Sequence, residues 1–224
     1  MKGLAEFVMR GRFQALLVTV AGSGSLMFCW ISAAVVALVI LRKGVAAGLW
    51  LVFWGLLPAG VLAYAVGDSG PLSLLLGTTA LAIVLRNTVN LPLAVLASVA
   101  VGGLTGLAMV VFAGASLEQI VTYFGEFLAS LEQQLSQGDQ QIVLARPDAT
   151  QIAGMMGVGA GMTAVLCLLL ARYWQALLYN PGGFGGEFKA LYYPPAVAAL
   201  LALLTVGLAS MGASYRTWAR SEER

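Results

Sequence analysis

Residues 13–41 read FQALLVTVAGSGSLMFCWISAAVVALVIL, a run of 29 residues without a charged side chain. As one α-helix this run would be about 43 Å long, because each helical residue rises about 1.5 Å. The hydrocarbon core of a bilayer is only about 30 Å thick. Its middle, AGSGS at 21–25, consists of small residues that favour a break. The run therefore predicts either two helices, over 4–21 and 26–41, or one long tilted helix over 13–41.

The whole chain has the composition of an integral membrane protein. Of its 224 residues, 60% are hydrophobic and 10% are charged, whereas soluble domains carry about 25% charged residues. Further apolar segments that approach or reach the length of a membrane span are 48–66, 71–85, 91–114, 151–178 and 194–214. We therefore predict an all-α polytopic integral membrane helical bundle, a single transmembrane domain over 1–224. It has about seven spans, or six if 13–41 is one helix.

The Lys and Arg residues favour seven spans, because cytoplasmic loops are rich in these cations. With seven spans, eight of the 12 Lys and Arg residues lie inside and four lie outside. With six spans, the division is seven inside against five outside. Seven spans also place the acidic segment 118–148 outside, although three arginines of the polar tail 215–224 then lie there too.

One polar insertion, residues 116–150, interrupts the apolar segments. Over 116–135 apolar residues recur every three or four positions, which is the period of an amphipathic helix. Ser116 and Gln119 match the start of a capping box. We expect an amphipathic helix outside the membrane, between the last-but-two and last-but-one spans, followed by a polar loop over 133–148. This helix either lies on the bundle or bilayer as a cap or acts as a gate over a site.

The composition excludes several kinds of chemistry. The chain has no histidine, which excludes His-ligated zinc, a Ser-His-Asp triad and a haem held by imidazole. Cys29 and Cys167 lie in apolar runs without CxxC spacing, so we expect buried small side chains rather than metal ligands. A net charge of +2 gives no reason to expect a nucleic-acid partner. We predict no catalytic residue, no metal, no cofactor and no enzymatic activity.

Two polar clusters are candidate sites, since polar groups at membrane depth are costly. Arg86, Asn87 and Asn90 lie together after the apolar segment 71–85. They are either a cytoplasmic charge with turn asparagines, or an anion or docking site.

The second cluster is RYWQALLYNPGGFGGEFK at 172–189. Its aromatic residues are typical of a membrane interface, and NPGG at 180–183 is expected to end a helix. It is an interfacial loop that needs no ligand, a loop that docks a partner with Glu187 and Lys189 exposed, or a small-ligand contact. The candidate contact residues are Trp174, Gln175, Tyr179, Asn180 and Glu187.

Glycines four residues apart predict where helices pack closely in lipid. Gly102 with Gly106 and Gly157 with Gly161 have this spacing. We expect them to pack helices within one bundle rather than to form a dimer.

Several motifs together resemble the YybS-like family of uncharacterised bacterial inner-membrane proteins, over about residues 4–210. The motifs are the 172–188 block, MRGR at 9–12, LRKG at 41–44, and GT at 77–78 with VLR at 84–86. The resemblance implies a multi-pass protein of the bacterial inner (plasma) membrane. It also implies a fold similar to the S components of energy-coupling-factor vitamin transporters, with 116–150 as a lid and the small-residue face of the first helix as a docking surface. Similar proteins continue with further spans, so this chain is expected to be shorter at its C-terminus.

These observations predict a small-molecule binding or transport subunit. Nearly all charges lie at span ends, in the acidic insertion or in the tail, which disfavours an ion-conducting path and favours a small hydrophobic or neutral ligand. The alternative is a membrane scaffold that docks other membrane proteins through residues 172–189.

Overall fold

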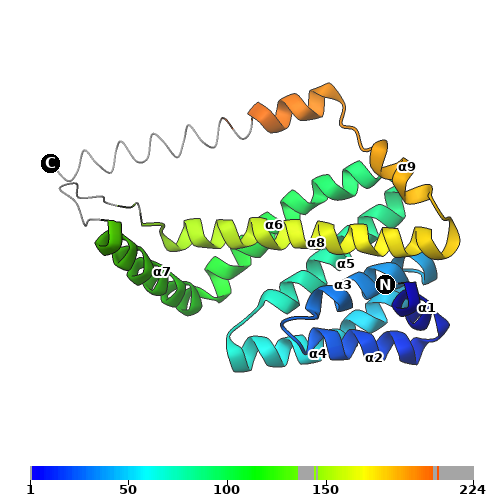
Figure 1. The fold of residues 1–224 in the computed structure, drawn as a ribbon, viewed down its shortest axis with the longest axis horizontal. Helices are drawn as coiled ribbons and strands as arrows, with labels where there is room; N and C mark the ends of the chain where they lie inside the picture. The colour runs from blue at the N-terminus through cyan, green and yellow to red at the C-terminus, as the bar shows by residue number, and fades with distance from the viewer. Residues whose placement is uncertain (1, 136–143, 145, 204–205, 207–224) are drawn as a thin grey trace. The chain divides into compact units, whose positions relative to one another are not determined.

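The computed structural model describes residues 2–135, 144, 146–203 and 206, and these contain helices and connecting turns without a strand (Figure 1). The chain forms two units, Met1–Glu187 and Phe188–Arg224. In the second unit, residues 195–203 are helical. The other helices are α1 (Lys2–Arg10), α2 (Arg12–Ser23), α3 (Cys29–Lys43), α4 (Val45–Val66), α5 (Gly70–Thr88), α6 (Leu91–Phe112), α7 (Gly114–Leu135), α8 (Ala149–Tyr179) and α9 (Gly183–Lys189).

The apolar run 13–41 is broken where its small residues predict a break. Helix α2 ends at Ser23 and α3 begins at Cys29. Lys43 Nζ donates a hydrogen bond to the carbonyl of Met9 at 3.3 Å, so the end of α3 returns to the residues that precede α2. The two helices therefore form a hairpin, and the alternative of one continuous helix over 13–41 is wrong.

The helix expected over 4–21 is also divided. Gly11 has an extended backbone, with φ −165° and ψ 170°, and separates α1 from α2. Helices α2 and α3 contain 12 and 15 residues, about 18 and 22 Å, which is less than the thickness of the hydrocarbon core.

Four helices of the described residues are long and apolar enough to cross a membrane, namely α4, α5, α6 and α8. Seven spans therefore stay a prediction. The last expected span, 194–214, lies partly outside the described residues, and the tail 215–224 lies wholly outside them. Large apolar side chains of α4 and α6 are exposed, such as Phe53 and Phe112, as a lipid-facing surface requires.

Helix α3 is the centre of the bundle. Every residue from Ser32 to Ile40 is buried, and α3 contacts α2, α4, α5 and α8. A helix that is apolar on all sides is one that other helices can surround. The short α3 is therefore covered by protein rather than by lipid.

Helices α6 and α8 pack closely through the glycines that the spacing singled out, and Figure 1 shows α6 crossing α8 obliquely. A Cβ atom on Gly157 would lie 2.4 Å from the carbonyl oxygen of Gly102. One on Gly161 would lie 2.9 Å from the carbonyl oxygen of Ser98, and one on Gly106 would lie 3.0 Å from that of Ala153. The expected packing within one bundle is confirmed.

Several helix boundaries differ from those expected. Asn87, which was expected in a turn, lies in a helix, because α5 continues through Arg86 to Thr88. The expected capping box at Ser116 is wrong, since α7 already begins at Gly114. A capping box is present at the start of α8, where Asp148 and Gln151 bond each other's backbone N–H groups at 2.7 and 3.2 Å.

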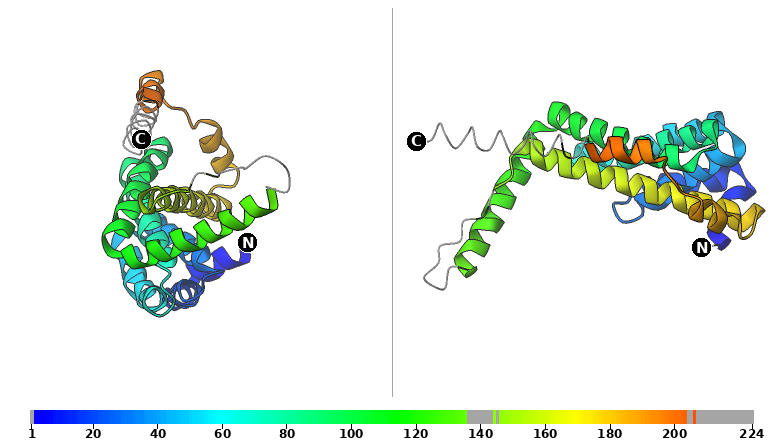
Figure 2. Two further views of the ribbon diagram at one scale, coloured as in Figure 1. Left: turned by 90° about the vertical axis from the view of Figure 1, so that its left-hand side faces the viewer. Right: turned by 90° about the horizontal axis from the view of Figure 1, so that it is seen from above.

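The amphipathic helix in the polar insertion is confirmed as α7. Its one buried residue is Leu117, which packs with Ile152 and Ala153 at the start of α8. Beyond that contact α7 leaves the bundle, as the right-hand view of Figure 2 shows. Near its end, Glu132 lies 3.6 Å from Arg146 in an ion pair. The expected loop 133–148 is described only in part, since residues 136–143 and 145 lie outside the described residues.

Candidate functional site

The bundle has a basic end. The ends of α3, α5 and α8 meet there, because Arg86 Nη1 donates to the carbonyl of Ile40 at 2.7 Å and the Arg42 guanidinium lies 3.6 Å from the centre of the Tyr179 ring. Lys43 lies there as well, bonded to Met9.

The bundle also has an acidic end, where α5 and α8 begin. Asp68 precedes α5 and Asp148 caps α8. Helix α7, which carries three glutamates, starts beside the first turns of α8. Cations gather on the cytoplasmic side of membrane proteins, so this distribution favours a cytoplasmic basic end.

A cleft of about 280 Å³ opens at the acidic end. We call it the acidic-end cleft. It lies among the segment between α2 and α3, the start of α5, and the facing sides of α6 and α8. Its polar lining residues are Cys29, Asp68, Ser69, Ser73, Thr105 and Thr163, and its apolar ones include Leu26, Leu74, Met109 and Met156.

The polar groups of the cleft are arranged to accept hydrogen bonds. Thr105 and Thr163 each donate their hydroxyl hydrogen to a carbonyl one turn earlier in their own helix, both at 2.8 Å. Ser73 does the same to Gly70 at 2.9 Å. A hydroxyl oxygen that has donated its hydrogen can still accept. The lining therefore suits a ligand that brings N–H or O–H donors.

Asp68 adds a carboxylate to this lining. Its Oδ1 accepts the backbone N–H of Gly70 at 2.7 Å, which fixes the side chain at the start of α5. Within the part of the chain that the structure describes, Asp68 has no ion-pair partner. The lining of the cleft therefore combines one carboxylate with several hydroxyl acceptors.

The first predicted cluster is largely structural. Arg86 lies against the end of α3, where it also donates to the carbonyl of Leu41 at 2.9 Å. Asn90 caps α6, since its Oδ1 accepts the N–H of Leu93 at 3.1 Å. Asn87 is exposed near the end of α5. The structure thus shows Arg86 joining α5 to α3 and Asn90 capping α6.

Trp174 differs most from expectation. It is fully buried, with 0% of its surface exposed, so it does not lie on the surface of the cluster, and its role as a ligand or partner contact stays a prediction. Its indole N–H has no hydrogen-bond partner among the described residues. Helix periodicity explains the burial, because Ala171 and Cys167, three and seven residues earlier, are also buried on that face of α8.

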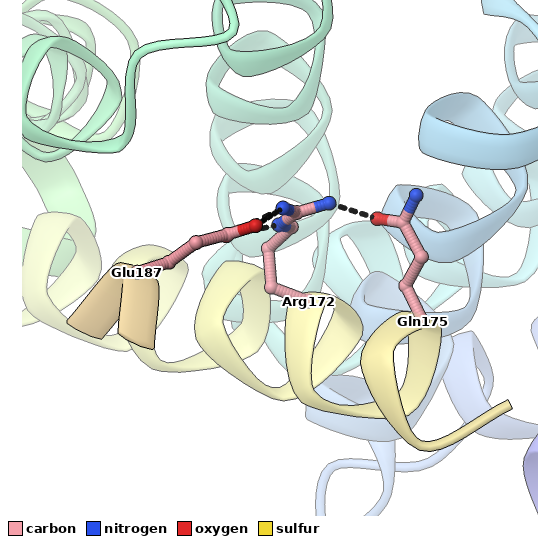
Figure 3. Close-up of polar contacts among 3 residues, drawn as sticks. All are labelled: Arg172, Gln175 and Glu187. Carbon is pink, nitrogen blue, oxygen red and sulfur yellow. Dashed lines mark hydrogen bonds and ion pairs between the residues drawn. The ribbon is translucent and has the colours of Figure 1, made fainter. Parts of the chain in front are cut away.

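Other residues of the second cluster contact one another (Figure 3). Arg172 binds both carboxylate oxygens of Glu187, with Nε to Oε2 at 3.2 Å, and its Nη1 donates to Gln175 at 2.6 Å. Helix α8 ends at Tyr179, as NPGG predicts, and Asn180 is its C-cap. Residues 172–187 therefore form a folded helix pair rather than an open loop.

Sequence reasoning missed the acidic-end cleft. Its lining comes from four separate segments, and most of its hydroxyl groups are single residues inside apolar helices. Only Asp68, a lone carboxylate between two apolar segments, gives a signal in the sequence. The described residues contain no group of three or more His, Cys, Asp or Glu side chains that could hold a metal ion.

Comparison with known proteins adds no identification, since no protein family, curated protein or solved structure matches this chain. The resemblance to the YybS-like family and to transporter S components therefore stays a prediction from the quoted motifs.

Proposed function

We propose that this protein is a small-molecule-binding membrane subunit that takes its ligand in the acidic-end cleft. The observation that carries the proposal is the cleft itself, in which the Asp68 carboxylate and three helix hydroxyls face a space of about 280 Å³. Pockets for drug-sized ligands measure about 300–1,000 Å³. The ligand is accordingly small and carries hydrogen-bond donors, with an apolar part beside Met109 and Met156.

A second feature agrees with a binding role. Met109 lines the cleft and also packs against the cluster of Leu117, Ile152 and Ala153 that anchors α7. The start of α7 is thus one side chain away from the cleft. Movement of α7 would change the position of Met109, which supports a lid function for residues 116–150.

The experiment is a thermal-stability screen of the purified full chain in neutral detergent, with a panel of amines, polyols and vitamins. A ligand at 100 times its dissociation constant stabilises the folded state by about 2.7 kcal/mol. For a chain of this size that corresponds to a rise in Tm of about 5–10 °C.

Paired variants locate the site. Asp68→Asn is expected to abolish the shift, whereas Glu118→Gln, an equal charge change on α7 at the same end, is expected to preserve it. A panel without any stabilising compound, or a shift that survives in Asp68→Asn, would contradict the proposal.

Docking of a membrane partner through residues 172–189 is the second proposal. Partly exposed aromatic residues such as Tyr173 support it, but the pairing of Glu187 with Arg172 occupies a charge that docking would use. Cross-linking from a photoreactive residue at position 173 tests it, and recovery of no protein adduct in membranes would refute it.

A further inference from the structure

A second open space lies at the basic end, far along the helices from the acidic-end cleft. It measures about 620 Å³ and we call it the basic-end groove. It runs between the start of α2, the end of α3 and the start of α4. Its lining residues include Arg12, Ala15, Lys43, Ala46, Ala47 and Trp50.

The groove has an apolar floor. Ala15, Val39 and Leu51 line it and are all buried, at 2% exposed each. The small side chains of Ala46 and Ala47, in the first turn of α4, leave the space open. Such a floor suits hydrocarbon rather than a water-soluble anion.

The rim of the groove is cationic and aromatic. Arg12 and Lys43 are exposed, and neither has an ion-pair partner in the described ranges. Trp50 is 43% exposed and its ring meets that of Trp54 edge to face, with centroids 6.3 Å apart. Trp and basic residues together are typical of the level of lipid headgroups.

Two of the helices that border the groove, α2 and α4, also carry exposed apolar side chains. Phe13 and Leu17 on α2 are 83% and 63% exposed, and Phe53 on α4 is 61% exposed. An acyl chain that left the groove would therefore continue over apolar side chains. Basic pockets between helices at the cytoplasmic side are a recognised way to bind anionic lipid headgroups.

We propose that the basic-end groove binds an anionic phospholipid, with its phosphate between Arg12 and Lys43 and an acyl chain over Ala15, Ala46 and Trp50. The opposite charges of phosphate and rim, together with the apolar floor, select this occupant. No side chain caps α2 or α4, so their first N–H groups add to the positive potential. The site is independent of the acidic-end cleft.

The test measures lipid binding to the full chain in neutral detergent by native mass spectrometry, with phosphatidylglycerol, phosphatidylcholine and inorganic phosphate as probes. Phosphatidylglycerol is expected to bind and phosphatidylcholine to bind at least tenfold more weakly. Each basic residue near a lipid surface contributes about 1 kcal/mol. The variant Arg12→Gln/Lys43→Gln should therefore weaken binding about 30-fold, at 1.4 kcal/mol per tenfold change.

The matched control is Lys2→Gln/Arg10→Gln, which removes the same charge from α1, outside the groove. It is expected to change the dissociation constant less than threefold. Equal weakening in this control would overturn the proposal, because it would show a general attraction between charges. Equal binding of the two lipids would overturn it as well.

Two further measurements test whether a folding defect explains the weaker binding and whether the site binds a free anion instead of a lipid. Arg12→Gln alone, which leaves the Lys43 bond to Met9 intact, should weaken binding about fivefold, and Ala46→Leu should weaken it by filling the groove with both charges present. Unchanged binding in both variants would overturn the proposal. Inorganic phosphate at 10 mM should not displace phosphatidylglycerol, and full displacement would instead identify a phosphate site.

Discussion

Arg86 binds the end of a helix 46 residues earlier, through hydrogen bonds from Nη1 to the carbonyl of Ile40 at 2.7 Å and to that of Leu41 at 2.9 Å. The Ile40 carbonyl also accepts the backbone N–H of Gly44 at 3.2 Å. The Leu41 carbonyl is among the last of the helix, which lack N–H partners within it, and a cation is favourable at this end. One side chain thus joins α5 to the buried α3.

Replacing Arg86 should destabilise the bundle. Arg86→Met is expected to lower the free energy of unfolding by about 1.5–3 kcal/mol, the usual contribution of hydrogen bonds from a charged group. Arg86→Lys keeps the charge and a donor nitrogen, so its free energy of unfolding should lie between those of Arg86→Met and the wild type. Chemical denaturation in detergent measures both. Asn87→Ala is the control and should change stability by less than about 0.5 kcal/mol, as exposed substitutions do; equal effects at the two positions would exclude the structural role.

The glycine contact between α6 and α8 makes a sharper prediction. In Gly157→Ala the new methyl group would meet the Gly102 carbonyl at 2.4 Å, and overpacking of this kind costs about 1–3 kcal/mol. Gly159, two residues later, faces open space. Gly159→Ala should therefore leave the Tm unchanged or raise it, since alanine favours helix. Comparable losses of Tm in the two variants would mean that helix propensity rather than close packing governs both.

Much of the fold was predictable because its signals are local. The small residues at 21–25 break the apolar run, and NPGG at 180–183 ends α8, as their backbone preferences require. The glycine spacing predicted that these faces of α6 and α8 pack closely within the bundle, because the spacing depends on one helix face only, but it did not predict which helix each one meets. Each of these predictions needs only the residues that lie within a few turns.

Other features depend on partners distant in the sequence. The burial of Trp174 depends on which helices surround that face of α8. The aromatic residues next to it in the sequence do not predict this burial. The Arg86 bond to Ile40 and the lining of the acidic-end cleft likewise join segments that are tens of residues apart. The break at Gly11 has no strong local signal, since a single glycine is tolerated within many helices.

The hairpin of α2 and α3 predicts the side of the membrane on which the N-terminus lies. Because Lys43 meets Met9, residue 2 and residue 87 should face the same, cytoplasmic side, and residue 119 on α7 the other. Single cysteines at these positions, in a Cys29→Ala/Cys167→Ala background, can be labelled with a membrane-impermeant maleimide. Labelling from outside is expected only at 119. Labelling of position 2 together with 119 would contradict the hairpin topology.

The pairing of Arg172 with Glu187 should control the local order of α9 and little else. Helix α9 has seven residues, too few for stability without tertiary contacts. Partly exposed ion pairs contribute about 0–1 kcal/mol, so Glu187→Gln should speed amide hydrogen exchange over 183–187 up to about fivefold, with Tm changed by less than about 3 °C. Lys189→Gln, a charge change in the same helix, should leave exchange unchanged.

A double-mutant cycle tests the pairing itself. Adding Arg172→Gln to Glu187→Gln should cause no further increase in the exchange rate, because the partner is already lost. Additive increases would instead mean that each residue orders α9 through separate contacts.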